Sequence, residues 1–269
     1  MRSLKKIILC ADDFGISQGV SNGIIQLLEK NRLSAVSCMS LGQAWGKTAH
    51  DLKPFEQQTA VGLHITLTYL PPLNKSIGVS HPCEKTLFLQ TWTRTLDQRK
   101  IKQEIKEQFE HFIDVWGQAP DFIDGHQHVH VLPLIRDFIL DLRSRYAPQA
   151  WMRNVVHLTS LEHQKQLILA VLGWYFCQRL KKENIPHNHQ IFGFYNLYQP
   201  TDFSSYLERW IEKADPEKPA LIYCHPGFPD ASLKGIDDVF DARQREFDFL
   251  SSDTFGLWLQ ERIKLVKHC

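Results

Sequence analysis

Short apolar runs alternate with longer segments of helical periodicity along most of the chain. Residues 7–11 (IILCA) and 219–224 (PALIYC) are almost continuously apolar, which is typical of strands buried on both faces of a parallel sheet. The same criteria predict further strands at 35–41, 59–68, 121–126, 150–155 and 190–194. About seven strands alternating with helices indicate an α/β protein with a parallel sheet.

Segments with apolar residues every three or four positions predict the helices that connect these strands. Ser17 is placed to cap the first helix, in which Val20, Ile24 and Leu27 lie on one face. Further helices are expected at 96–116, 133–146, 161–182, 203–214, 239–250 and 255–266. The range 69–92 is rich in Pro, Gly and Ser and is expected to be a long irregular segment.

The number of strands and the length of 269 residues favour one domain over residues 1–269, a distorted (β/α) TIM-like barrel. An open doubly wound sheet is the less favoured alternative. No GxGxxG follows the first expected strand, so the pattern does not indicate a dinucleotide-binding fold.

The net charge and the hydropathy of the chain indicate which classes of binding partner to expect. Lys plus Arg total 31 against 30 Asp plus Glu, so a nucleic-acid partner is not expected. The longest apolar stretch, 167–176, is too short to span a bilayer, and we expect a barrel helix there rather than a patch for a lipid-linked substrate or a second subunit. With six cysteines and no CxxC pair, the chain is expected to be cytoplasmic, without stable membrane insertion. A homodimer is a candidate assembly that the sequence neither favours nor excludes.

Polar residues of the kinds that bind metals follow several of the expected strands. The first strand ends in Asp12 and Asp13, the third carries His64, the fifth ends near Arg153, and the last leads into His225. Because the carboxyl ends of all strands in an α/β barrel meet on one face, these side chains are expected to share one pocket. Taken singly, the aspartates could form a turn and helix cap, and His64 could be a core histidine.

The segment DGHQHVH carries a stronger signal. Alternate residues of a strand share one face, so His126, His128 and His130 are expected to crowd together, which favours a metal or catalytic site. One carboxylate and two histidines form a common ligand set for a divalent ion with open positions. Metal-assisted hydrolysis needs such an ion together with a base and an acid.

Four motifs, in order along the chain, carry a family resemblance. They are ADDFG at 11–15, GLH at 62–64, DGHQHVH at 124–130 and HPG at 225–227. With them the chain resembles the YdjC-like carbohydrate deacetylase family, which includes chitooligosaccharide deacetylases and hopanoid-associated members. Where the family usually has a further histidine, this chain has Gln127. The resemblance implies a distorted barrel and one divalent ion, Mg²⁺ or Zn²⁺, held by Asp13, His64 and His126.

The same resemblance implies roles for the neighbouring residues. Asp12 would be the base that activates water, and His225 the acid that protonates the departing amine. Arg153 would orient Asp12 or grip the substrate. His128 and His130 are weaker candidates for substrate contacts.

The implied reaction is hydrolysis of the N-acetyl group of an amino sugar, either an oligosaccharide or a glycolipid, in carbohydrate metabolism. The sequence does not choose among such substrates. Five aromatic residues are candidates for stacking on a sugar, namely Trp92, Trp151, Phe194, Tyr195 and Tyr198. Two rival classes stay open: a metal-dependent phosphoesterase or other amidohydrolase on the same barrel, and a non-catalytic sugar-binding relative.

Overall fold

The strands of the protein form one curled parallel sheet. The computed structural model of the chain describes residues 4–73, 75–78, 81–156, 164–237 and 239–269. The sheet has the strand order β5-β4-β3-β2-β1-β7-β6, and the short β8 pairs with the beginning of β1. The strands are β1 Lys5–Phe14, β2 Ala35–Cys38, β3 Ala60–Ile65, β4 Phe122–Gly125, β5 Trp151–Met152, β6 Gln190–Phe192, β7 Ala220–Cys224 and β8 Ile263–Leu265.

The two outer strands of this order come together and nearly close the sheet. The segment that leads into β6 lies beside β5, where Met152 forms an isolated parallel bridge with His187 and its main-chain N–H donates to the carbonyl of Pro186 at 2.9 Å. The prediction of a distorted TIM-like barrel of about seven parallel strands is therefore confirmed. Strand β8 is an eighth, three-residue addition to this barrel.

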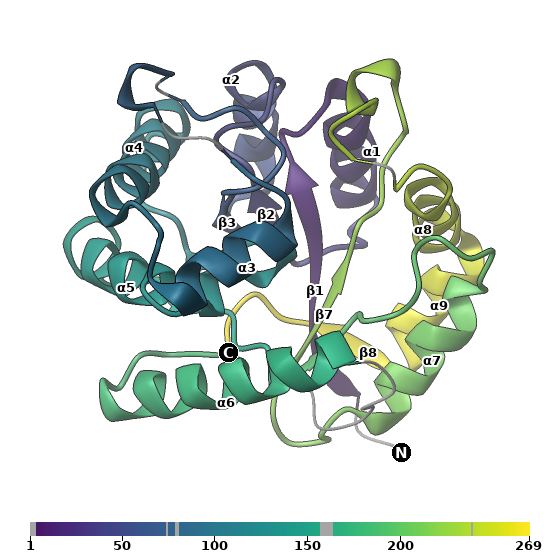
Figure 1. Cartoon of the computed structure of the whole chain (residues 1–269). Coiled ribbons are helices and arrows are strands. Elements are labelled where there is room, and N and C mark those ends of the chain that lie inside the picture. Colours follow the sequence, from purple (N-terminus) through teal and green to yellow (C-terminus); the bar gives the residue numbers. More distant parts are fainter. Residues whose placement is uncertain (1–3, 74, 79–80, 157–163, 238) are drawn as a thin grey trace.

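Helices surround the strands, with β1 and β7 in the middle of the molecule (Figure 1). The first helix begins after Ser17, whose hydroxyl accepts a hydrogen bond from the Val20 main-chain N–H at 3.2 Å, as expected for an N-cap. The helices are α1 Gln18–Glu29, α2 Trp45–Thr48, α3 Glu84–Thr93, α4 Gln98–Trp116, α5 Ile135–Tyr146, α6 Gln164–Lys182, α7 Phe203–Lys213, α8 Asp241–Ser251 and α9 Asp253–Glu261. Short 3₁₀ helices are η1 Ala49–Phe55, η2 Lys75–Ile77, η3 His126–Val131 and η4 Ala231–Leu233.

Two differences from the expected elements have local causes. Helix α3 lies within the range 69–92 that was expected to be irregular; its buried residues are Leu87 and Thr91, so its apolar periodicity is weak. The expected helix at 255–266 ends at Glu261, and residues 263–265 pair with β1 instead. The part of the expected helix at 161–163 lies outside the described residues.

Helix α6 carries an exposed apolar face. Five large apolar side chains on successive turns are between 43% and 56% exposed, namely Leu167, Ile168, Val171, Trp174 and Tyr175. No helix among the described residues is both long enough and apolar enough to cross a membrane. The expected helix is therefore present, and a patch for a lipid-linked substrate or a second subunit stays the less favoured alternative.

A close contact between two neighbouring strands fixes the packing on one side of the barrel. The ring of Phe122 on β4 covers Gly62 on β3 and stacks on Trp151 at a centroid distance of 4.4 Å. A Cβ atom at position 62 would come within 2.4 Å of that ring. Since Phe122 is fully buried, its ring has little room to withdraw, and a glycine is needed here.

The substitution Gly62→Ala is therefore expected to lower the free energy of unfolding by about 1–3 kcal/mol, because it overpacks the core. Gly46→Ala is the matched control, since a Cβ there meets no atom within 4 Å and position 46 lies in a helix. Urea unfolding followed by circular dichroism measures the free energy of unfolding of the two variants. An unchanged midpoint in Gly62→Ala, with the slope unchanged, would contradict the packing described.

Candidate metal centre and active site

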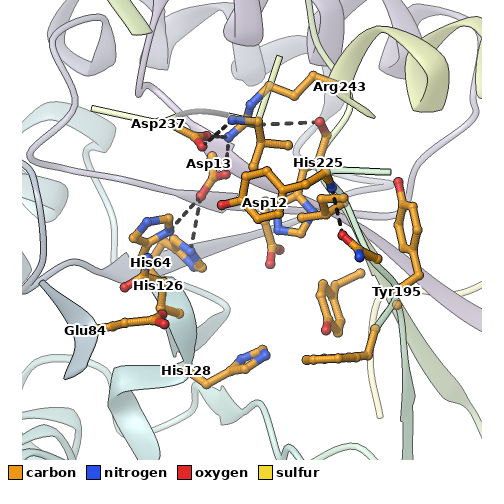
Figure 2. A pocket seen from close by; sticks show the side chains of 18 of the residues that line it. Asp12, Asp13, His64, Glu84, His126, His128, Tyr195, His225, Asp237 and Arg243 are labelled. Atoms are coloured by element: carbon orange, nitrogen blue, oxygen red, sulfur yellow. Dashed lines mark hydrogen bonds and ion pairs between the residues drawn. The ribbon is translucent and has the colours of Figure 1, made fainter. Parts of the chain in front are cut away.

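The residues singled out at the strand ends surround one cavity. This cavity of about 760 Å³ is lined by residues at or just after the carboxyl ends of strands β1, β3, β4, β6 and β7 and by side chains of α7 and α8. Figure 2 shows Asp13 with His64 and His126 below it and Arg243 above it, and with His225 nearby. The predicted convergence of Asp12, Asp13, His64, His126, His128 and His225 on one cavity is therefore seen in the structure.

An irregularity at the end of β1 lets two successive carboxylates face this cavity. In a regular strand Asp12 and Asp13 would point to opposite faces of the sheet. Here the register between β1 and β2 shifts between Ala11 and Phe14, and Asp13 adopts a left-handed backbone conformation with φ of 68°. A left-handed aspartate is locally strained, so the surrounding contacts must hold it in place.

The side chains of Asp13, His64 and His126 form a compact set of metal-binding type. Their candidate ligand atoms all lie within 4.8 Å of one another. Asp13 Oδ1 is 3.4 Å from His64 Nε2 and 3.2 Å from His126 Nδ1, so one oxygen and two nitrogens converge on the same point. One carboxylate and two imidazoles suit a divalent transition metal such as Zn²⁺ better than an all-oxygen site would. The residues present thus fit a divalent ion.

Asp13 is held on its other side by Arg243. Arg243 Nη2 donates to Asp13 Oδ2 at 2.6 Å and also bonds Asp237, and both Asp13 and Arg243 are about 1% exposed. Burial alone would raise the pKa of Asp13, but Arg243 and the hydrogen bonds from His126 and His64 outweigh it and hold the pKa well below its ordinary value. Asp13 is therefore an anion whose Oδ2 is bonded to Arg243 and whose Oδ1 faces His64 and His126.

His64 is oriented by a second buried carboxylate. His64 Nδ1 lies 2.6 Å from Asp124 Oδ1, and the hydroxyl of Ser37 donates to the same oxygen at 2.6 Å. Burial would lower the pKa of His64, but Asp124 and Asp13 together raise it to about 10. With Nδ1 bonded to Asp124, Nε2 is the nitrogen directed at Asp13. A carboxylate behind a histidine in this way fixes ring orientation and increases the basicity of a metal ligand.

Arg153 joins this arrangement to Asp12. Its Nη1 and Nη2 donate to the two carboxylate oxygens of Asp12 at 2.6 and 2.7 Å, and Nη2 lies 2.6 Å from Asp124 Oδ2. Burial would lower the pKa of Arg153, but Asp12 and Asp124 raise it well above the ordinary value. Arg153 is fully buried and does not line the cavity, so it is placed to orient Asp12 and not to grip a substrate.

The histidine triplet differs from the expected strand. Strand β4 ends at Gly125, and residues 126–131 form a 3₁₀ turn in which Gln127 and His128 have left-handed φ values of 53° and 62°. His126 and His128 line the cavity, whereas His130 is fully buried. His130 Nε2 donates to the carbonyl of Arg153 at 2.9 Å. The expectation that all three imidazoles share one face is therefore wrong, and His130 is not placed to contact a substrate.

His225 follows β7 and lies at the cavity wall. Its ring packs edge-on against Tyr223 at a centroid distance of 5.8 Å. Its Nδ1 is buried and has no hydrogen-bond partner within the described ranges. Arg243 Nη1 donates to the His225 main-chain carbonyl at 3.4 Å, so the same guanidinium contacts Asp13 and the backbone of His225.

Sequence reasoning missed several residues of this site. Asp124 lies inside the DGHQHVH motif but was given no role, although its place near the carboxyl end of the expected strand 121–126 was a usable signal; in the structure it lies opposite His64. Glu84 lines the cavity from the start of α3, and Arg243 reaches it from α8. Neither residue is part of a recognisable sequence motif. Of the five aromatic candidates, Phe194, Tyr195 and Tyr198 line the cavity. Trp92 and Trp151 do not: the first is 66% exposed and the second packs on Phe122.

Comparisons with known proteins agree with this geometry. Residues 6–261 match the sequence profile of the family described as YdjC-like protein. The chain is 29% identical over 267 residues to the chitooligosaccharide deacetylase of Yersinia pestis (strain Pestoides F), covering 96% of this chain and 95% of the relative. The corresponding protein of Yersinia pseudotuberculosis serotype O:1b (strain IP 31758) gives the same values.

A solved structure has the same fold. It is that of a candidate cellobiose-phosphate cleavage protein of Enterococcus faecalis V583, with a TM-score of 0.76 and 21% sequence identity, and 98% of each chain is covered. At this identity the similarity concerns the arrangement of the barrel and not its chemistry.

The contact between Asp124 and His64 leads to a prediction about metal affinity. Asp124→Asn replaces the carboxylate behind His64 by a neutral amide, so it is expected to weaken Zn²⁺ binding about 10- to 100-fold. Calorimetric titration with Zn²⁺ measures the affinity, and circular dichroism checks that the variant is folded. The exposed Asp114→Asn is the control. Equal affinity in a folded Asp124→Asn would show that this carboxylate does not support His64 as a ligand.

Proposed function

Because the chain belongs to the YdjC-like protein family, we propose that it is a carbohydrate deacetylase that hydrolyses the N-acetyl group of an amino sugar with the help of a divalent ion. The observation that carries this proposal is the compact set of Asp13, His64 and His126 with a second carboxylate, Asp12, next to it on the same cavity. This arrangement supplies the ligands and the base that amide hydrolysis by an ion and a water molecule requires.

Asp13, His64 and His126 would hold the ion. When bound, it would polarise the acetamide carbonyl and make a nearby water more acidic. Asp13 is suited to this role because Arg243 keeps it ionised, and His64 because Asp124 directs its Nε2 toward Asp13. Mg²⁺ and Zn²⁺ are both candidates, and the two imidazoles favour Zn²⁺.

Asp12 is the proposed general base. Its carboxylate lines the cavity and is held in a fixed plane by the two hydrogen bonds from Arg153. Each carboxylate oxygen can accept more than one hydrogen bond, so Asp12 can still accept a proton from a water in the cavity. Arg153 thereby positions the base without touching the substrate.

His225 is the proposed general acid, which would donate a proton to the nitrogen as the amide C–N bond breaks, releasing acetate and an amine. Its Nδ1 forms no hydrogen bond with the rest of the described chain, and its ring lies at the cavity wall. A single histidine in this position supplies the proton that an amine leaving group needs.

The cavity walls support a sugar substrate. Phe194, Tyr195, Tyr198, His128 and Glu84 all line the cavity. Aromatic faces pack against the apolar faces of sugar rings, and the imidazole and carboxylate can hydrogen-bond hydroxyl groups. Both an oligosaccharide and the head group of a glycolipid remain candidate substrates.

The rival phosphoesterase is less well supported. It predicts additional cations near the strand ends and a second metal cluster. Arg243 is such a cation, but it is bonded to Asp13 and Asp237, and Arg209 and Lys213 line the cavity from α7 and not from a strand. Across the described residues, one group of three metal-binding side chains is found.

The reaction class can be tested by acetate release. The purified protein is expected to release acetate from at least one member of a panel of N-acetylated amino sugars that includes an N-acetylated chitooligosaccharide and a glycolipid. Release should require added Mg²⁺, Zn²⁺ or Co²⁺ and stop with a chelator. Phosphate release from phosphomonoesters in place of acetate, under the same conditions, would contradict deacetylation.

The assignment of the base can be tested separately. Asp12→Asn is expected to lower kcat about 10²- to 10⁴-fold, because an amide cannot accept the proton from water. Bound metal, measured by atomic emission, should be nearly unchanged in Asp12→Asn and lost in His64→Ala. Normal activity in Asp12→Asn would show that another group is the base.

A further inference from the structure

Glu246 is a buried carboxylate on α8 that the reaction as proposed does not use. It lies one turn after Arg243, is fully buried, and does not line the cavity. Burial raises its pKa. An anion that no solvent reaches needs strong hydrogen bonds to be retained. The hydrogen-bond partners of its two carboxylate oxygens therefore indicate the role of Glu246.

Each oxygen of Glu246 has a different partner at the cavity wall. Oε1 accepts a hydrogen bond from the hydroxyl of Tyr195 at 2.5 Å, and Oε2 accepts one from the main-chain N–H of His225. Tyr195 follows β6 and His225 follows β7, and these two strands are neighbours in the sheet. One carboxylate thus connects two loops that line the cavity. One loop carries Tyr195, a candidate for stacking on the sugar, and the other carries His225, the proposed general acid.

Helix α8 contacts the loop of His225 at several points. Arg243 Nη1 donates to the His225 carbonyl at 3.4 Å, and the Gly227 N–H donates to the Arg243 carbonyl at 3.2 Å. The main chain of His225 is therefore held at its carbonyl by Arg243 and at its N–H by Glu246. Tyr195 is itself fixed by the rings of Phe203, Tyr206 and Trp210, at centroid distances of 5.3 to 6.0 Å.

From these contacts we infer that Glu246 is a positioning residue, which fixes the backbone of His225 relative to Tyr195 and so sets where the acid imidazole stands in the cavity. This inference rests on the proposed role of His225 as general acid. A hydrogen-bonded carboxylate can act through its geometry or through its charge. The two bonds at Glu246 span separate loops, which favours geometry.

Two conservative substitutions separate geometry from charge. Glu246→Gln keeps the length of the side chain: its amide oxygen can accept from the His225 N–H, while its NH₂ group donates to Tyr195, whose hydroxyl can turn to accept. Glu246→Asp keeps the charge but withdraws the carboxylate by about 1.5 Å, one bond length, so it cannot reach both partners. A positioning role predicts that Glu246→Asp is the more damaging change.

The expected kinetic result follows from the lost hydrogen bond. In Glu246→Asp, kcat should fall about tenfold while KM stays within about twofold, because a displaced acid affects the transition state and not substrate binding. Glu246→Gln should keep kcat within about threefold of the unchanged protein. Glu261→Asp and Glu261→Gln, at an exposed position on α9, are the matched controls.

Hydrogen exchange of the His225 main-chain amide provides a readout that does not depend on activity. It should be about tenfold faster in Glu246→Asp than in the unchanged protein and nearly unchanged in Glu246→Gln. If no sugar releases acetate but the amide responds in this way, the proposed function fails and the placement of His225 stands. Unchanged exchange in Glu246→Asp, or a greater loss of kcat in Glu246→Gln than in Glu246→Asp, would overturn the inference.

Discussion

The site depends on a connected set of buried charges in which each carboxylate is bonded to a cation. The connections run from Asp12 to Arg153, from Arg153 to Asp124, from Asp124 to His64, from His64 to Asp13, and from Asp13 to Arg243. Arg153 is the cation that contacts Asp12, so its removal would leave Asp12 as a buried, uncompensated charge, which is far more costly than the net value of the pair. The proposed metal ligands and the proposed base are therefore fixed by the same set of contacts.

The barrel makes this arrangement possible. Its parallel strands deliver Asp12, Asp13, His64 and Asp124 to one end of the sheet, and the irregular end of β1 turns two successive carboxylates toward one cavity. Helix α8 then adds the contacts that no strand supplies, with Arg243 on Asp13 and Glu246 on the backbone of His225. The strained backbone of Asp13 is maintained by these contacts.

Sequence patterns predicted the parts of this molecule that are local and missed those that depend on tertiary contacts. Buried apolar runs predicted the strands, and polar residues near their carboxyl ends predicted a shared pocket. The family resemblance then selected Asp13, His64 and His126, which the structure brings together. The same reasoning failed at His130, because the chain leaves the strand at Gly125 and enters a 3₁₀ turn. Arg243 and Glu246 lie on an ordinary amphipathic helix far along the chain, and only the folded structure brings them to Asp13 and His225.

In the proposed site one divalent ion is held by Asp13, His64 and His126 while Asp12 keeps its hydrogen bonds to Arg153. Anomalous diffraction from crystals of the protein grown with Zn²⁺ tests this most directly. We expect a single strong peak within bonding distance of Asp13 Oδ1 and of one nitrogen each of His64 and His126, with both Arg153–Asp12 hydrogen bonds intact. A peak bound by Asp12 in place of Asp13, or no peak in this cavity, would contradict it.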